Sequence, residues 1–304
     1  MLMKKIYLLI FLLSFFLYNI KTFAQVSANQ MNKQQLKLFR EHVYGGQPDT
    51  NKLLVRNAYV TSYNNEFRIP NWSAYHITID YLKTPRRIGK FAKFRPDPNV
   101  SDPVTTKEYI GLFNSLGYAR GHLAPYKIMG GDRDHDGKYA SLIDTISDPD
   151  DELTVYQGNY LSNIAPQLHK NFNGSGGLWY KTEQLVRNIV NYDSIDLWVF
   201  SGCVILNIRS PRKVGNVENI TVPDMFYKLI IKDNDGEFPS VLAFLFPHFD
   251  TGLDITEKDI FKYLVTVDYI EAITGMDFFN EFMPTVQDSC EKIIDIKSWD
   301  SNVK

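Results

Sequence analysis

Five short runs of aliphatic, β-branched and aromatic residues constrain the fold of this 304-residue chain more than any other feature. Each run has the length of a strand and is bounded by turn residues. The runs are Leu54–Val60, Ser73–Ile79, Leu197–Phe200, Met225–Ile231 and Val241–Phe246. Asn234-Asp235-Gly236, between the last two runs, is typical of a tight hairpin turn. The sequence therefore predicts that a sheet forms the centre of the fold.

Helical patterns are fewer and lie outside these runs. Apolar residues recur at helical spacing from Leu178 to Val190, which predicts an amphipathic helix. A second helix is expected from Lys33 to His42, and a third begins near Asp268 and stops at Gly275. The acidic stretch from Asp144 to Glu152 is expected to be an exposed loop.

The N-terminus predicts export. Lys4 and Lys5 precede an apolar run from Ile6 to Leu17, and small residues follow near Ala24. This order is typical of a cleaved signal peptide, and the run is shorter than the roughly 20 residues of a membrane anchor. We expect a signal peptide over 1–24, an N-terminal extension over 25–52, one domain over 53–298 and a tail over 299–304. The protein is then secreted or periplasmic, with no stable membrane insertion after cleavage.

Charge limits the ways in which this chain can bind nucleic acid. The formal charge is −2, and the predicted signal peptide contains three lysines and no acidic residue, so the mature chain would carry −5. Contact with a polyanion would therefore need a local positive region or a bound cation. The densest positive segment is the basic loop from Thr84 to Pro98. It is either a solvated loop or a surface for a phosphate backbone.

Two further features leave alternatives open. Asp132, Asp134 and Asp136 precede Gly137 as in a calcium loop, but Ile143 stands where the bidentate Glu belongs. The segment is therefore either a Ca²⁺ site or an acidic surface turn. Cys203 and Cys290 form either one disulfide or two buried thiols.

The stretch from Gly117 to Pro125 carries the first sign of chemistry. Arg120 and His122 flank Gly121. Arginine matches phosphate geometry with a permanent charge, and histidine accepts a proton near neutral pH. The pair indicates hydrolysis of a phosphoester, although such a tripeptide is common by chance and needs support from other residues.

That support comes from a second stretch. Ser162-Asn163-Ile164-Ala165-Pro166-Gln167 is followed by Phe172-Asn173 and then by Trp179 and Glu183. Together with Arg120-Gly121-His122, this ordered set resembles the DNA/RNA non-specific endonucleases, which belong to the ββα-metal (His-Me finger) nucleases. The resemblance covers roughly 53–298. It implies an α+β fold, with a central, mostly antiparallel β-sheet flanked by helices and a ββα-metal finger motif.

The resemblance also implies a role for each matching residue. His122 is the expected general base, and Arg120 is expected to contact phosphate. Asn173 is the expected protein ligand of a divalent cation, Mg²⁺ or another such as Mn²⁺. Glu183 would hold the waters bound to that cation, and Asn163 would orient the region of the catalytic histidine.

This sequence departs from the family pattern in ways that leave alternatives. Ala119 stands where the family usually has Asp. The stretch from Asn163 to Glu183 is longer than the family pattern, so Asn171 rivals Asn173 as the ligand. The further catalytic arginine of the family falls on Ala92 in an ungapped comparison, and three basic-loop residues could replace it at the substrate. Those residues are Arg87, Lys90 and Lys93.

The function expected from these features is metal-dependent, largely sequence-independent hydrolysis of DNA, with RNA as an open second substrate. Oxygen ligation by Asn argues against zinc, which prefers Cys and His. One alternative is a non-catalytic relative that only binds nucleic acid. Another is a phosphodiesterase for small nucleotides.

Overall fold

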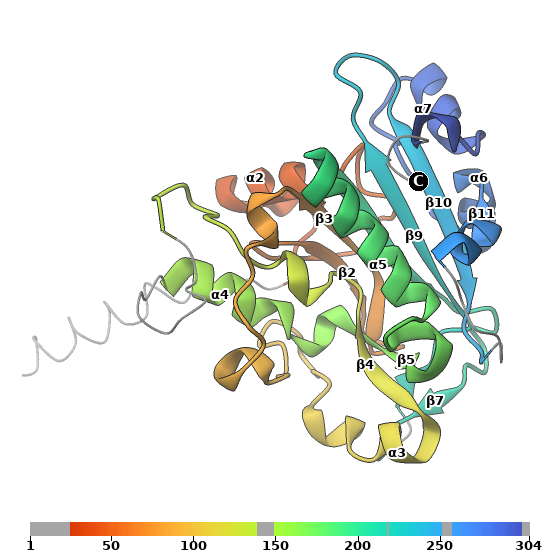
Figure 1. Ribbon diagram of the computed structural model, residues 1–304. Coiled ribbons are helices and arrows are strands. Elements are labelled where there is room, and N and C mark those ends of the chain that lie inside the picture. Colours follow the sequence, from red (N-terminus) through yellow and green to blue (C-terminus); the bar gives the residue numbers. More distant parts are fainter. Residues whose placement is uncertain (1–24, 139–148, 218, 251–256, 300–304) are drawn as a thin grey trace, which may run out of the picture.

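The computed structural model describes residues 25–138, 149–217, 219–250 and 257–299 (Figure 1). The predicted signal peptide and position 143 of the possible calcium loop lie outside the described residues. Within the described ranges, no helix is both long and apolar enough to cross a bilayer.

A seven-stranded sheet in the order β1-β2-β3-β6-β9-β10-β11 forms the centre of the fold. Every neighbouring pair in it is antiparallel, which confirms the predicted α+β class. The strands are β1 (Leu53–Val55), β2 (Val60–Asn64), β3 (Ile69–Ile77), β6 (Leu197–Val204), β9 (Met225–Lys232), β10 (Ser240–Pro247) and β11 (Leu264–Val265). Two small pairs lie outside it: β4 (Tyr118–His122) with β5 (Ile164–Leu168), and β7 (Lys213–Val214) with β8 (Ile220–Thr221).

The prediction of one strand over Leu54–Val60 was wrong, because the chain turns back between β1 and β2. The Arg56 backbone N–H donates to the Tyr59 carbonyl at 2.9 Å and closes the turn. The buried Arg56 guanidinium donates to both carboxylate oxygens of the buried Asp97, at 2.6 and 2.7 Å. A charged side chain at a tight turn therefore interrupts what reads as a continuous strand.

Helices cover both faces of the sheet (Figure 1). One core cluster joins one face to α2 (Lys33–His42), α6 (Val267–Thr274) and α7 (Pro284–Glu291). The other cluster joins the opposite face to α5 (Leu178–Asn188), the β4–β5 pair and part of α4 (Pro149–Gly158). The short α3 (Leu112–Leu116) leads directly into β4.

The predicted helices are present with small changes at their ends. Asn32 and Gln35 form a capping box at the start of α2, as each side chain accepts a hydrogen bond from the other residue's backbone N–H. Thr266 caps α6, which ends at Gly275 in a left-handed conformation (φ 70°). The predicted Leu178–Val190 helix is α5 plus the start of a π-helical turn, η8.

Short 3₁₀- and π-helical segments fill many of the connections. They are η1 (Ala28–Gln30), η2 (Asp80–Leu82), η3 (Gly89–Ala92), η4 (Thr106–Tyr109), η5 (Tyr126–Ile128), η6 (Leu161–Asn163), η7 (His169–Asn173), η8 (Ile189–Asp193), η9 (Glu257–Tyr263) and η10 (Lys297–Trp299).

The prediction that Asp144 to Glu152 is an exposed loop was wrong where the structure describes it. Residues 149–152 form the start of α4, and Asp151 is buried. Its Oδ1 accepts a hydrogen bond from the Arg133 backbone N–H at 3.1 Å. A tertiary contact therefore turns part of an acidic run inward.

Cys203 and Cys290 are free, buried thiols. Cys203 belongs to the core cluster on the α5 face of the sheet, and Cys290 belongs to the cluster on the α7 face. Of the two alternatives left open by the sequence, the structure therefore has two buried thiols. Burial raises the pKa of both.

Buried histidines make stability depend on pH. Burial lowers the pKa of His42, His76 and His248 to about 4 each, and that of His122 to about 3. In the unfolded chain these groups take up protons below about pH 6.5, and each unit of difference is worth about 1.4 kcal/mol. Their stabilisation is therefore complete above pH 6.5 and is lost as the pH falls toward 4.

We expect the unfolding temperature to fall by several degrees between pH 7 and pH 4.5, measured by circular dichroism at constant ionic strength. Burial raises the pKa of Glu291 to about 7 and also raises the pKa of Glu183, Asp196 and Glu271, so these carboxyls act in the opposite direction and reduce the fall. The variant His42→Gln should show a shallower decline than the wild type. An unfolding temperature that rises toward pH 4.5 would contradict the expectation.

Candidate active site

A ββα unit lies on one face of the large sheet. Strands β4 and β5 pair antiparallel with His122 opposite Ile164 and Gly121 opposite Ala165, and α5 follows (Figure 1). A Cβ atom on Gly121 would lie 2.0 Å from Oε1 of Gln167, so this position needs glycine. The unit carries Arg120 and His122 on β4 and Glu183 on α5.

Asn159 fixes the imidazole of His122. The Asn159 amide Nδ2 donates to the Phe91 carbonyl at 2.7 Å, so its Oδ1 faces the other way as an acceptor. This Oδ1 lies 3.1 Å from His122 Nε2 and also accepts from Arg87 at 3.0 Å. His122 Nε2 must therefore be the donor, which leaves Nδ1 unprotonated and able to accept a proton.

The surroundings of His122 favour its neutral form. The residue is only 8% exposed, and its ring lies 5.4 Å from the ring of Phe94. Burial and, to a lesser extent, the charge of Arg87 lower the pKa of His122 to about 3, against the opposing effect of the hydrogen bond to Asn159. The imidazole is therefore a base already free of its second proton at neutral pH.

Arg87 and Arg120 meet at one aromatic ring. Their guanidinium carbons lie 4.7 and 5.1 Å from the ring centroid of Phe94. Arg120 donates no hydrogen bond to another described residue, and its buried Nε has no acceptor there. Two forked cations beside a neutral imidazole form a site suited to a phosphate group.

The structure separates the three basic-loop candidates. Arg87 reaches the His122 environment through Asn159. Lys90 instead pairs with Glu152 at the start of α4, and Lys93 is exposed in the loop. Among the three, Arg87 is the one that the structure places beside the proposed base.

Asn163 lies behind the site. It is fully buried, its Oδ1 accepts from the Ala124 backbone N–H at 2.9 Å, and its Nδ2 donates to the Ala124 carbonyl at 2.8 Å. Its own carbonyl accepts from the Leu123 N–H at 3.0 Å. These bonds hold the two residues that follow His122, which suits the predicted orienting role.

The two candidate metal ligands point to different neighbours. The side-chain amide N–H of Asn173 donates to Gln167 Oε1. The Gln167 side chain packs against Gly121 on the β4–β5 pair. Asn171 has a left-handed backbone (φ 58°) and donates to Asp250 at 2.8 Å at an exposed position. The geometry therefore favours Asn173 over Asn171, and the Asn173 Oδ1 accepts no hydrogen bond from another described residue.

Glu183 lies on α5 with a positive partner one turn later. Its Oε2 is 3.8 Å from Arg187 Nη1, and the side chains are 16% and 21% exposed. Burial raises the pKa of Glu183, while Lys228, Arg187 and hydrogen bonding by Trp179 lower it and leave a net rise. The sequence analysis assigned a role to neither Arg187 nor Asn159; a charge pair at i, i+4 from Glu183 was the available signal for Arg187.

Carboxylates of Asp132, Asp134 and Asp136 lie within 4.8 Å of one another. They also accept hydrogen bonds from their own loop. Asp132 accepts from the N–H groups of Asp136 and Gly137 at 3.1 and 2.8 Å, and Asp134 accepts from Asp136 at 3.2 Å. The cluster therefore has the geometry of a hydrogen-bonded acidic turn, whether or not it takes up Ca²⁺.

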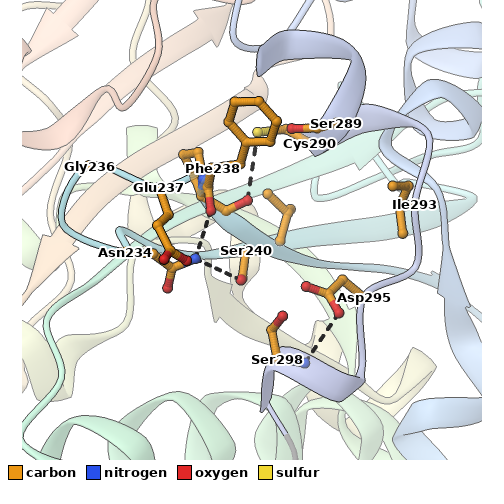
Figure 2. A pocket seen from close by; sticks show the side chains of 12 residues that line it. Asn234, Gly236, Glu237, Phe238, Ser240, Ser289, Cys290, Ile293, Asp295 and Ser298 are labelled. Carbon is orange, nitrogen blue, oxygen red and sulfur yellow. Dashed lines mark hydrogen bonds between the residues drawn. The ribbon is translucent and has the colours of Figure 1, made fainter. Parts of the chain in front are cut away.

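A pocket of about 590 Å³ lies away from the ββα unit, between the β9–β10 hairpin and the C-terminal segment (Figure 2). Asn234, Phe238 and Ser240 line it from the hairpin, and Cys290 and Asp295 line it from the other side. None of the predicted site residues lines this pocket. The candidate site residues therefore lie in a different part of the described chain.

Comparisons with known proteins find nucleases among the relatives of this chain. Nuclease C1 of Cunninghamella echinulata var. echinulata is 28% identical over 254 residues, which covers 81% of this chain and 90% of that protein. A nuclease of Nostoc sp. is 28% identical over 82% of this chain and 80% of that protein. The mitochondrial nuclease EXOG of Danio rerio is 29% identical over 73% of this chain and 59% of that protein.

A solved structure supports the fold. A chain in the crystal structure of the EndoG/EndoGI complex superposes with a TM-score of 0.62 at 20% identity, and the match covers 84% of this chain and 95% of that one. The sequence profile of the DNA/RNA non-specific endonucleases matches residues 40–284. Because this match spans most of the chain, the protein belongs to the DNA/RNA non-specific endonuclease family.

Proposed function

We propose that this member of a nuclease family is an exported, metal-dependent endonuclease that hydrolyses phosphodiester bonds in DNA, with RNA as a second substrate. The observation that carries the proposal is the imidazole of His122, whose Nδ1 is left unprotonated by the hydrogen bond of Nε2 to Asn159. Two arginines adjoin it, and both guanidinium groups lie at Phe94.

His122 supplies the base for this reaction. Nδ1 takes a proton from water as the water oxygen forms a bond to phosphorus, and the ester P–O bond on the opposite side breaks. Arg87 and Arg120 bind the phosphate oxygens and balance the negative charge that develops there. The departing oxygen leaves with the bond electrons and then takes up a proton.

The residues present fit a divalent cation with oxygen ligands. Because Asn173 donates its amide N–H to Gln167, its carbonyl oxygen is the atom left for a ligand. Asn173 would hold the cation and Glu183 would hold its waters, an arrangement that suits Mg²⁺ or Mn²⁺ because Mg²⁺ keeps most of its water. When bound, such an ion stabilises charge on the scissile phosphate and the leaving oxygen.

Low sequence selectivity follows from the same groups. Arg87 and Arg120 are placed to contact phosphate, and phosphate contacts carry no sequence information directly. Export rests on the signal-peptide pattern of residues 1–24. Relatives named as mitochondrial nucleases show that family members occupy other compartments, so fractionation of producing cells should test whether the chain leaves the cytoplasm.

The direct test is cleavage of supercoiled plasmid DNA by the purified protein. We expect nicking and then degradation with Mg²⁺ or Mn²⁺, complete arrest by a chelator, and recovery when excess Mg²⁺ is restored. A single-stranded RNA tested in parallel decides the second substrate. Binding of DNA without cleavage at any Mg²⁺ concentration would favour a non-catalytic relative, and turnover of dinucleotides alone would favour a small-nucleotide phosphodiesterase.

A further inference from the structure

Lys228 is a buried cation in the middle of the large sheet. It lies on β9 between Phe226 and Ile230, which share its face of the sheet, and all three are fully buried. Its register neighbours are Ser201 on β6 and Phe244 on β10. Its Nζ has no hydrogen-bond acceptor within the described residues. Burying an ammonium group without an acceptor costs free energy, so its presence needs an explanation.

The neighbours of Lys228 belong to the ββα unit. Its Nζ lies 3.8 Å from the ring centroid of Trp179, near the start of α5. The Trp179 indole N–H in turn donates to the backbone carbonyl of His122 at 3.2 Å. Glu183 follows one turn later on the same helix. Lys228 therefore adjoins the indole that supports the proposed base, on the helix that carries the proposed water-holding carboxylate.

Charge links Lys228 to Glu183. Burial and, to a lesser extent, Arg187 lower the pKa of Lys228 to about 8, against the opposing negative charge of Glu183. Among the groups that lower the pKa of Glu183, the charge of Lys228 has the larger effect and that of Arg187 follows. The buried Tyr75 on β3 also faces Glu183. The Glu183 carboxyl is thus influenced by the charge of a lysine from the sheet and by Arg187 on its own helix, whose Nη1 lies 3.8 Å from its Oε2.

We propose that Lys228 is a positioning residue for the nuclease reaction: its buried ammonium packs on the indole of Trp179, and through that indole it positions the backbone at His122 and the part of α5 that carries Glu183. The inference rests on the proposed function. It explains why an ammonium without a hydrogen-bond acceptor among the described residues stands where an apolar side chain would stabilise the sheet.

The decisive comparison is Lys228→Met against Lys228→Arg. Met keeps much of the volume and removes the charge, so the unfolding temperature should be unchanged or higher. We expect kcat to fall about 10- to 100-fold, as for loss of a group that supports a metal site. KM for DNA should change less than about twofold because the phosphate-binding arginines are untouched. Half-saturating Mg²⁺ should rise, and Lys228→Arg should recover part of kcat.

Lys232 offers a matched control on the same strand. Its Nζ lies 4.8 Å from the ring centroid of Trp299 and donates at 2.6 Å to the carbonyl of Ser298, a residue that lines the pocket away from the ββα unit (Figure 2). Like Lys228→Met, the variant Lys232→Met removes an ammonium group that lies near an indole ring. It should leave kcat and the Mg²⁺ dependence as in the wild type.

A readout without catalysis completes the test. With ¹³C-labelled glutamate and a Glu183→Gln variant for assignment, the Glu183 carboxyl can be titrated by NMR. We expect its pKa in Lys228→Met to be higher by about one unit or more, because the cation that favours the ionised form is gone. The acid limb of the pH–rate profile should move in the same direction.

Two results would overturn the inference. One is a folded Lys228→Met protein with wild-type kcat, Mg²⁺ dependence and Glu183 titration. The other is a loss of activity that parallels a lower unfolding temperature and is not relieved in Lys228→Arg, since that pattern marks a purely structural residue. Wild-type protein that never cleaves with Mg²⁺ would instead refute the proposed function, and the NMR titration would still decide the role of Lys228.

Discussion

Replacing His122 with alanine is expected to lower kcat for plasmid cleavage by about 10²- to 10⁴-fold, the usual contribution of a positioned general base. The loss follows from the geometry, because His122 Nδ1 is kept free of a proton by the Nε2 hydrogen bond to Asn159. Binding of DNA should persist, because Arg87 and Arg120 remain. Single-turnover cleavage and a filter-binding assay at the same Mg²⁺ concentration measure the two effects separately.

His76→Ala is the control for removal of a partly buried imidazole. His76 stacks on Trp198 at 4.4 Å, outside the ββα unit, and has no role in the proposed chemistry. We expect it to lower stability while kcat stays near the wild-type value. Addition of imidazole should partly restore His122→Ala, since the cavity left by the ring adjoins the Phe94 ring. Wild-type cleavage by a folded His122→Ala protein would refute the proposed mechanism.

The sequence predicted the scaffold well because the scaffold depends on local patterns. The strand runs at Met225–Ile231 and Val241–Phe246 became β9 and β10 with ends shifted by one residue, since burial on both faces requires continuous apolar runs. The predicted helix Lys33–His42 has the same bounds in the structure. The failure at Leu54–Val60 came from a distant contact of Arg56 with Asp97, which no local pattern encodes.

The sequence named individual residues of the candidate site but did not show which residues contact one another. Family motifs singled out His122, Asn173 and Glu183, and the structure places all three in one ββα unit or its connecting turn. Asn159 was missed because its contact with His122 joins residues 37 positions apart. Nothing in the spacing of an asparagine shows which way its amide is turned.

The choice of Arg87 among three basic residues shows the same limit. Charge alone does not distinguish between Arg87, Lys90 and Lys93 as candidate substrate contacts. The difference between them is that Asn159 accepts from Arg87, whereas Glu152 pairs with Lys90. Asn159 and Glu152 each lie more than sixty positions from the basic residue that they contact. Glu152 ends the predicted acidic loop, and Asn159 lies just before the motif that begins at Ser162. Choosing which cation to propose as a substrate contact therefore required the tertiary structure.

The choice between Asn173 and Asn171 gives the second large expected effect. Asn173→Ala removes the oxygen proposed to bind the divalent cation, so cleavage at a fixed, low millimolar Mg²⁺ concentration should fall by about 10²-fold or more. Part of the activity should return at high Mg²⁺ or with Mn²⁺, because the rest of the site is intact. Asn173→Asp keeps an oxygen at the same place and should retain more activity than Asn173→Ala.

Asn171→Gly is the matched control, because glycine accepts the left-handed backbone of Asn171 without strain. That variant loses the exposed contact with Asp250 and should cleave DNA with nearly wild-type Mg²⁺ dependence. Calorimetric titration with Mg²⁺ tests binding without turnover and should show weaker binding only for the Asn173 variants. The reverse pattern would assign the ligand to Asn171, and would mean that the η7 turn rearranges when the cation binds.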